Sequence, residues 1–206
     1  MERASSESPV KRRRVSAVAR KELLLETALR RAREEGAGSL TLARLADACG
    51  VSKPIAYQHF GSLAGLLRAM FQQVGAEYED RVMAVMASHR EARTAHEGAL
   101  RALCDAYVAC TLENGALHAD IGAALVAEGE PVATVYADDA ERYCPLVTEL
   151  LGVDQRTAYA LTMAFLGAAD RLCEAVVAGR LRQEEAVEVL LRLFPSSACP
   201  MAPPGP

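Results

Sequence analysis

Twenty residues in the first third of this 206-residue chain constrain its fold more than any other feature. Residues 41–60 read TLARLADACGVSKPIAYQHF. Thr41 can cap a short helix, because its hydroxyl can accept bonds from unpaired N–H groups of the first turn. Gly50 can take the left-handed conformation that ends a helix. Ser52 is then a second N-cap, and Pro54 falls in the next first turn, where a missing N–H costs nothing. The segment predicts two short helices joined by a sharp turn.

The second of these helices is expected over residues 53–59, with Ile55 as its inward anchor. The side chains expected to face outward combine one cation, small groups and hydrogen-bonding rings; they include Lys53, Pro54, Ala56, Tyr57 and His59. Such a surface suits phosphates and the edges of bases. Two short helices with this turn are the geometry that inserts one helix into the major groove of DNA. The segment therefore predicts a DNA-binding helix-turn-helix.

Over its N-terminal third the chain resembles the TetR family of bacterial transcription regulators. An amphipathic helix precedes the pattern A-x-x-x-G-V-S-x-x-x-x-Y-x-H-F, which is matched by Ala46, Gly50, Val51, Ser52, Tyr57, His59 and Phe60. The resemblance implies a three-helix DNA-binding head whose last helix is the recognition helix. It also implies a larger helical domain that binds a small molecule and forms a homodimer.

The resemblance assigns roles to individual residues of the head. Thr41 and Ser52 become phosphate-facing caps, Lys53 and Tyr57 become phosphate contacts, and Pro54, Ala56 and His59 become candidates for groove contact; Arg44 is a further DNA-binding candidate. The sequence departs from the family at two places. Pro54 stands where the family often has Gly, and Gly61-Ser62-Leu63-Ala64 lacks the Lys that usually follows the His-Phe pair. Ser62 can still cap the following helix.

Charge is divided unevenly along the chain. Residues 1–60 hold 12 Lys and Arg against 7 Asp and Glu, whereas residues 61–206 hold 11 against 20. Phosphate binding depends on local cations, so this asymmetry fits a basic head on an acidic body. The basic run before the first helix contains Arg12, Arg13 and Arg14 and predicts a flexible arm. The arm would contact phosphates or the minor groove, or serve only as a solvated tail.

Helical periodicity runs through the rest of the chain, and the fold class expected is all-α. Helices are expected at 15–35 and 62–87, with a break between domains in 88–98, and then at 99–113, 117–128, 131–151, 154–179 and 183–194. The domains expected are an arm at 1–15, a helix-turn-helix head at 16–61, a regulatory and dimerisation domain at 62–194, and a disordered proline-rich tail at 195–206. No alternating run is long enough to predict a sheet.

The last two helices carry broad apolar stripes, which is typical of helices buried on more than one side. We expect them to form a four-helix bundle across a two-fold axis. The interface residues expected are Leu161, Phe165, Ala168, Leu172, Val187, Leu190, Leu191 and Phe194. The alternative is that both helices fill the core of one subunit. Two heads about one helical turn apart, ~34 Å, or a multiple of it, would read a near-palindromic operator.

A ligand pocket in the body would need an apolar lining with a few polar anchors. The candidates are Tyr107, His118, Asp120, Tyr136, Tyr143, Met163 and Phe165, each of which can equally be core or surface. The function predicted is a transcriptional regulator, a repressor that an unknown small molecule releases from its operator. The alternative is a thiol- or metal-responsive regulator that uses the same head.

Six scattered cysteines show no C-x-x-C pair and no histidine at zinc-ligand spacing, so neither a metal site nor a cofactor is expected. Cys104 and Cys110 would be the pair for a thiol sensor if the fold brought them together. No signal peptide or membrane span is evident, and the expected location is the cytoplasm. No nucleophile with a paired base is recognisable, and no enzyme is predicted.

Overall fold

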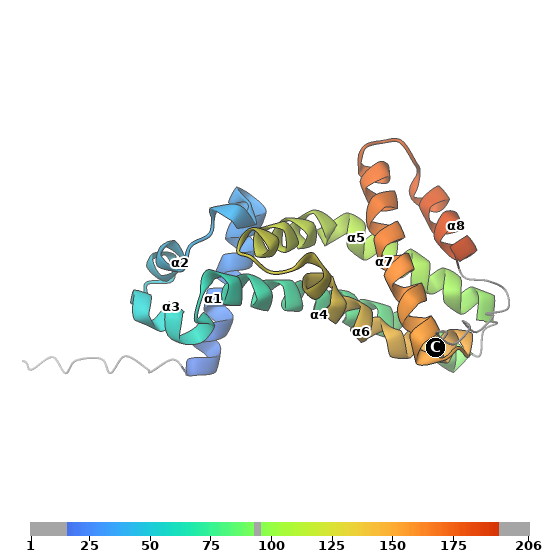
Figure 1. The fold of residues 1–206 in the computed structure, drawn as a ribbon, viewed down its shortest axis with the longest axis horizontal. Helices are drawn as coiled ribbons and strands as arrows, with labels where there is room; N and C mark the ends of the chain where they lie inside the picture. The colour runs from blue at the N-terminus through green and yellow to red at the C-terminus, as the bar shows by residue number, and fades with distance from the viewer. Residues whose placement is uncertain (1–15, 93–95, 194–206) are drawn as a thin grey trace, which may run out of the picture.

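The structure is a computed structural model that describes residues 16–92 and 96–193. The described residues form eight α-helices and one short 3-10 helix, without strands, so the all-α prediction is confirmed. Three helices make a small unit at one end of an elongated molecule, and a hairpin of the last two helices stands at the other end (Figure 1). The predicted arm at 1–15 and tail at 195–206 lie outside the described residues.

The head begins with α1 (Ala17–Glu35), whose first turn is capped by Ser16 through a 3.1 Å bond from Ala19 N–H. Gly36 ends this helix at φ 83°, and the short helix η1 (Ala37–Ser39) follows. Then come α2 (Leu42–Ala48) and α3 (Lys53–Phe60). The faces that meet are apolar, so the three helices close around Leu24, Leu45 and their neighbours, which are fully buried.

Most of the capping and turn residues predicted in the head take the predicted roles. The Thr41 hydroxyl accepts a 3.2 Å bond from Arg44 N–H and caps α2. Gly50 lies at φ 64° in the turn, a conformation that other residues adopt at a cost. Pro54 occupies the first turn of α3, and the Ser62 hydroxyl caps α4 with a 3.1 Å bond from Gly65 N–H. Ser52 has the backbone of an N-cap, but its hydroxyl makes no capping bond.

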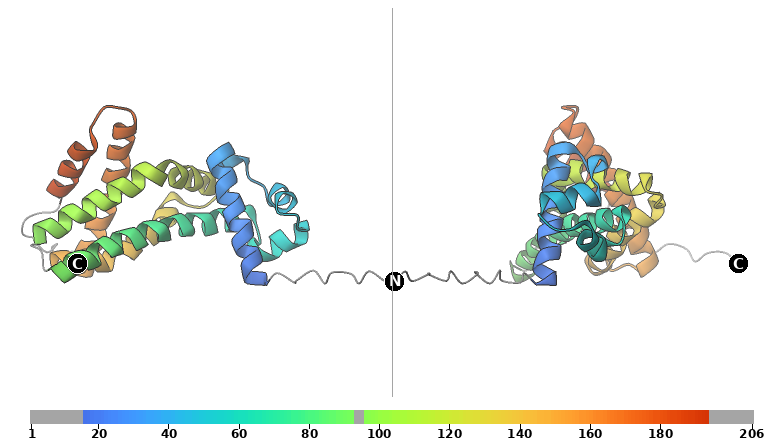
Figure 2. Two further views of the ribbon diagram at one scale, coloured as in Figure 1. Left: turned by 180° about the vertical axis from the view of Figure 1, so that it is seen from behind. Right: turned by 90° about the vertical axis from the view of Figure 1, so that its left-hand side faces the viewer.

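The body is built on two long antiparallel helices, α4 (Leu63–Ala92) and α5 (His96–Ala127), which pack along their lengths. The helix α4 leaves the head, and α5 returns to it (Figure 1). The chain then forms α6 (Val132–Leu151), α7 (Gln155–Val177) and α8 (Gln183–Leu193). The left view of Figure 2 shows that α7 and α8 stand across the part of α4 and α5 that is far from the head.

The helices of the body extend further than expected at two places. The helix α4 continues to Ala92 and α5 begins at His96, so both helices run into the range 88–98 in which a break was expected, and residues 93–95 between them lie outside the described residues. The helices expected at 99–113 and 117–128 are one, because Gly115 does not end α5. A Cβ added to Gly115 would lie 2.8 Å from Thr111 Cγ2, so the glycine provides room beside its neighbour rather than a turn.

Candidate DNA-binding surface and internal cavity

The exposed face of α3 offers donors and acceptors of different kinds. Lys53, Pro54, Tyr57 and Gln58 are all exposed, and Tyr57 shows 52% of its surface. Lys53 can neutralise a phosphate, the Tyr57 hydroxyl can donate to one, and the Gln58 amide has the donor-acceptor pair that matches adenine. Sequence reasoning missed Gln58. Its exposure could have been predicted, because Gln58 lies four residues after Pro54 and the two therefore share one face of a helix.

Ala56 is buried in the head, so the prediction that it faces outward was wrong. Its side chain is 0% exposed, because it stands four residues before the buried Phe60 on the face of α3 that packs into the head. Ile55, expected as the inward anchor, is only half-buried. The inward face of α3 is therefore rotated by about one residue from the expected register.

His59 stands at the edge of the exposed face. It is half-buried and lines a groove of about 560 Å³ between α1 and α4, together with Lys21 and Gln73. The His59 imidazole therefore lies beside the exposed face of α3 rather than at its centre.

Arg44 is held by partners within the head. One of its terminal nitrogens donates to the Ser39 carbonyl at 3.0 Å, and the other pairs with Glu35 at 3.2 Å. The side chain thus ties α2 to the end of α1 and to η1, although it stays exposed. The other predicted cations, Arg12, Arg13 and Arg14, lie outside the described residues.

A cavity of about 290 Å³ lies in the body between α4, α5 and α7. Tyr78 comes from α4, His118 from α5, and Asp170 and Cys173 from α7; these four line the cavity with Thr111, Gly115, Ala116, Ala119, Arg171, Glu174, Val177 and Ala178. Burial raises the pKa of Asp170 to about 6, with a further contribution from Glu174 that Arg171 opposes. Burial and Arg142 lower the pKa of His118 to about 4, so this imidazole is neutral at physiological pH.

The predicted ligand residues are distributed over several places. Among the candidates whose side chains the structure describes, only His118 lines this cavity. Tyr107, Tyr143 and Phe165 are buried beside it as an aromatic cluster, with the Tyr107 ring 5.1 Å from Phe165 and 6.0 Å from Tyr143 between centroids. Met163 is 40% exposed on the outside of α7 and does not line the cavity. The Tyr136 side chain is not among those that the structure describes.

Sequence reasoning missed Tyr78 and Asp170. Tyr78 belongs to the apolar stripe of α4, and periodicity alone cannot separate a core tyrosine from a cavity tyrosine. Asp170 carried a signal, because it is an acidic residue within a stripe whose other members are buried: Thr162, Leu166, Ala169 and Cys173.

Asp120, expected to anchor a ligand, instead connects the body to the head. Its carboxylate accepts a 2.5 Å bond from the backbone N–H of Ala37, in η1. The bond comes two residues after His118, which lines the cavity, so one stretch of α5 touches both the cavity and the head.

Three of the residues predicted for the dimer interface lie in the core of the single chain instead. Phe165, Val187 and Leu190 are buried within the single chain, at 6%, 1% and 0% exposure, so they pack the subunit core. Leu161, Ala168, Leu172 and Leu191 are half-buried, and Phe194 lies outside the described residues. An exposed apolar face remains on the other side of these helices, which we call the outer face; it consists of Tyr159, Ala160, Met163, Ala164, Gly167, Val189 and Leu193.

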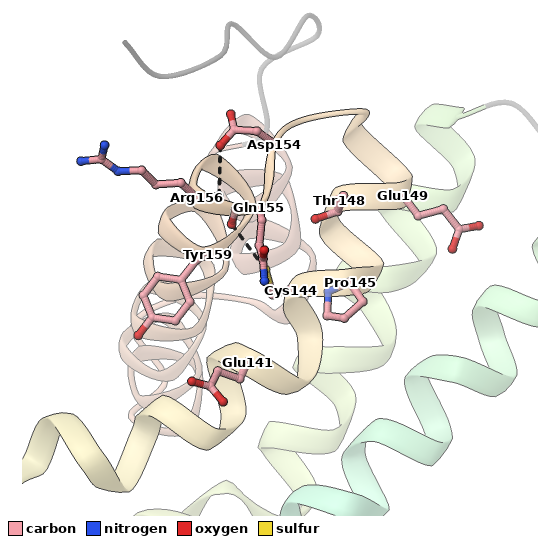
Figure 3. Close-up of a pocket in the computed structure, with 9 residues that line it drawn as sticks. All are labelled: Glu141, Cys144, Pro145, Thr148, Glu149, Asp154, Gln155, Arg156 and Tyr159. Atoms are coloured by element: carbon pink, nitrogen blue, oxygen red, sulfur yellow. Dashed lines mark hydrogen bonds between the residues drawn. The ribbon is translucent and has the colours of Figure 1, made fainter. Parts of the chain in front are cut away.

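A wider groove of about 1300 Å³ lies between the C-terminal half of α6 and the start of α7 (Figure 3). Glu141, Glu149, Arg156 and Tyr159 all line it and are exposed. Its floor is closed by Cys144, whose thiol lies 3.6 Å from the Gln155 carbonyl. The groove is an open surface feature that borders the outer face at Tyr159.

The cysteines do not form the pair considered for a thiol sensor. Cys104 and Cys110 both lie on α5, and six residues along a helix place them on different faces. Burial raises the pKa of both thiols, and burial and Asp170 raise the pKa of Cys173 to about 11. Thiols with raised pKa hold little of the reactive thiolate at neutral pH. Among the described residues no group of three metal-ligating side chains occurs.

No helix in the described ranges is long and apolar enough to cross a membrane. A comparison with curated protein sequences finds no significant match. The family model described as "Bacterial regulatory proteins, tetR family" matches residues 24–70, which contain most of α1 and all of α2 and α3.

Solved structures share the whole fold. The multidrug binding protein EbrR, solved with imidazole, is 24% identical, with a TM-score of 0.64 over 87% of this chain and 97% of that chain. A putative TetR regulator from Shewanella sp. PV-4 is 20% identical, with a TM-score of 0.62 over 85% and 95%. A TetR-family regulator from Streptomyces coelicolor is 22% identical, with a TM-score of 0.60 over 84% and 96%.

The family match covers the helix-turn-helix that exposes Lys53, Tyr57 and Gln58, and the structural matches extend over the body. The head thus carries the kind of DNA-binding helix-turn-helix that the bacterial regulatory proteins of this family model share. Residues 24–70 match the TetR family of bacterial regulatory proteins, and the solved structures, at 20–24% identity, share the fold of the whole chain.

Proposed function

We propose that this protein is a homodimeric repressor that binds a near-palindromic operator through α3 and releases it when a small molecule enters the α4–α5–α7 cavity. The observation that carries the proposal is the exposed face of α3, where a cation, a phenol and an amide stand together. A packed helix does not need such a face, and DNA uses each of these groups. Residues 16–61 form the DNA-binding head, and residues 62–194 the regulatory part.

The outer face supports a homodimer. Its members on α7 recur at intervals of three and four residues, and those on α8 are four apart, so each helix presents one apolar side. Contiguous exposed apolar surface of this kind marks an interaction site in a soluble chain. Because a two-fold interface uses the same patch twice, two copies would place two heads on one DNA molecule.

Release by a ligand is supported by the position of Asp120. A ligand that displaces α5 at the cavity also displaces the carboxylate that holds Ala37. An altered angle between head and body changes the spacing of two heads. A coupling free energy of ~1–3 kcal/mol is enough to weaken operator binding several-fold to about a hundredfold. A neighbour described as a multidrug binding protein was solved with ethidium, which supports a small organic ligand as the effector.

The test is selection of bound fragments from genomic DNA by the purified full-length chain at a stated salt concentration. The proposal expects enrichment of a site with two inverted half-sites. Recovery of fragments without a common site, at any salt that allows binding, would contradict sequence-specific repression.

A further inference from the structure

We propose that the α4–α5–α7 cavity selects a protonated aromatic amine. The inference rests on the effector role proposed for the same cavity and adds the chemistry of the ligand. It depends on three features of the lining: an acidic group, an unpaired phenol and flat aromatic rings. A different observation supports each of them.

The acidic group is Asp170. No ion pair or hydrogen bond to its carboxylate occurs among the described residues, although Arg171 is next to it in the chain. Arg171 is occupied by Glu174, at 2.7 Å. A carboxylate that is partly buried without a cation is costly, and the cost is why its pKa rises to about 6. A cationic ligand would supply the missing partner.

The unpaired phenol is Tyr78. Its side chain is 4% exposed, and its hydroxyl has no hydrogen-bond partner within the described part of the chain. Leaving a buried hydroxyl unsatisfied costs free energy, so such a group marks a place where a ligand or water belongs. A Cβ on Gly115 would stand 4.0 Å from this hydroxyl, so the absence of a side chain there leaves the approach to Tyr78 open.

The aromatic lining is made by the rings of His118 and Tyr78, and Phe71 supports the His118 ring without lining the cavity. The His118 ring stacks on Phe71 at 3.9 Å between centroids and lies 5.7 Å from Tyr78. Because the pKa of His118 is lowered to about 4, the ring carries no charge that would repel a cation. Aromatic faces attract cations and also stack on a ligand ring. The cavity, at about 290 Å³, has room for one or two fused rings with a short side chain.

The sequence provides a direct readout, because the chain contains no tryptophan. Indole fluorescence in a mixture therefore comes from the ligand alone. Three indoles of similar shape differ in charge: tryptamine is a cation, tryptophol is neutral, and indole-3-propionate is an anion. Fluorescence anisotropy of each, titrated with the full-length chain in the absence of DNA, measures the three affinities.

Tryptamine should bind at least about tenfold more tightly than tryptophol, because a hydrogen bond to a charged group contributes that much, and the anion should bind most weakly. Asp170→Asn should bring tryptamine to within about twofold of tryptophol. The matched control is Asp105→Asn, which removes the same charge from an exposed site on α5 outside the cavity and should keep the preference.

Equal binding of tryptamine and tryptophol by the wild-type chain would overturn the inference, as would the absence of binding by all three or a preference that survives Asp170→Asn. Operator release is measured separately. Amine-selective binding that leaves the operator bound would refute the effector role and uphold the cavity chemistry. Operator release by another ligand, combined with no preference for tryptamine, would uphold a ligand-released repressor and refute the cavity's preference for an amine.

Discussion

Lys53 and Gln58 are both exposed on α3, but their side chains have different uses on DNA. A lysine ammonium interacts with phosphates, which are the same in every sequence. A glutamine amide can pair with the donor and acceptor of one adenine, which distinguishes that base from the others. The two residues should therefore separate affinity from specificity.

Lys53→Ala should weaken binding to operator and random DNA alike and reduce the salt slope of log K by about one. Gln58→Ala should cost ~1–3 kcal/mol on the operator and little on random DNA. Anisotropy titrations at several salt concentrations measure both. Equal losses on the two DNAs for both variants would contradict this division of roles.

At the scale of elements, α5 is the helix that touches both the cavity and the head. His118 and Ala119 line the cavity, and Asp120 accepts a bond from η1. Under the proposed function, this contact is the short route by which a ligand in the cavity would act on the head. The Arg68–Glu130 ion pair, at 2.6 Å, adds a second tie, between the first half of α4 and the turn that follows α5.

Asp120→Ala should lower the free energy of unfolding by ~1–3 kcal/mol, because a charge-assisted bond is lost, and should shrink the ligand-induced change in operator affinity. Asp120→Asn keeps an acceptor oxygen and should recover part of both effects. Asp105→Ala, at an exposed site of α5, is the control. Thermal unfolding and operator titrations with and without ligand report the two quantities. An unchanged ligand response in Asp120→Ala would exclude this route.

Local chemistry predicted the head better than the body. Thr41, Gly50 and Pro54 determine the backbone only of residues close to them in the chain. The cap of α2, the turn and the start of α3 could therefore be predicted from the sequence. The inward position of Ala56 did not, because a rotation by one residue of a short helix is set by the helices against which it packs. The helices expected at 99–113 and 117–128 were wrongly divided for a related reason, since Gly115 lies inside one continuous helix. Whether a glycine ends a helix or makes room depends on its spatial neighbours.

At the scale of the whole molecule, the division of α7 into two sides explains the errors of the dimer prediction. A helix with apolar residues on most of its surface is expected to be buried on more than one side. The pattern does not say which side faces the core of its own subunit and which faces a second subunit. Phe165 takes the inner side, against Tyr107, and Met163 takes the outer side. The same division predicts that the apolar residues of the outer face are the ones that contact a second copy of the chain.

Met163→Arg should convert a dimer into a monomer, because a two-fold interface brings the two new charges close to each other. Met83→Arg is a matched control, since Met83 on α4 is equally exposed, at 40%, and lies off the outer face. Light scattering after gel filtration should give twice the chain mass of 22.0 kDa for the wild-type chain and for Met83→Arg. A Met163→Arg protein that still has twice the chain mass would place the interface elsewhere.

The central claim is that α3 enters the major groove of DNA in two copies. Guanine N7 faces that groove, so protection of N7 from methylation on a selected fragment tests the claim most directly. The account predicts two protected patches related by two-fold symmetry, with centres ~34 Å or a multiple of it apart. A single patch, or full methylation on a fragment that the protein demonstrably binds, would contradict it.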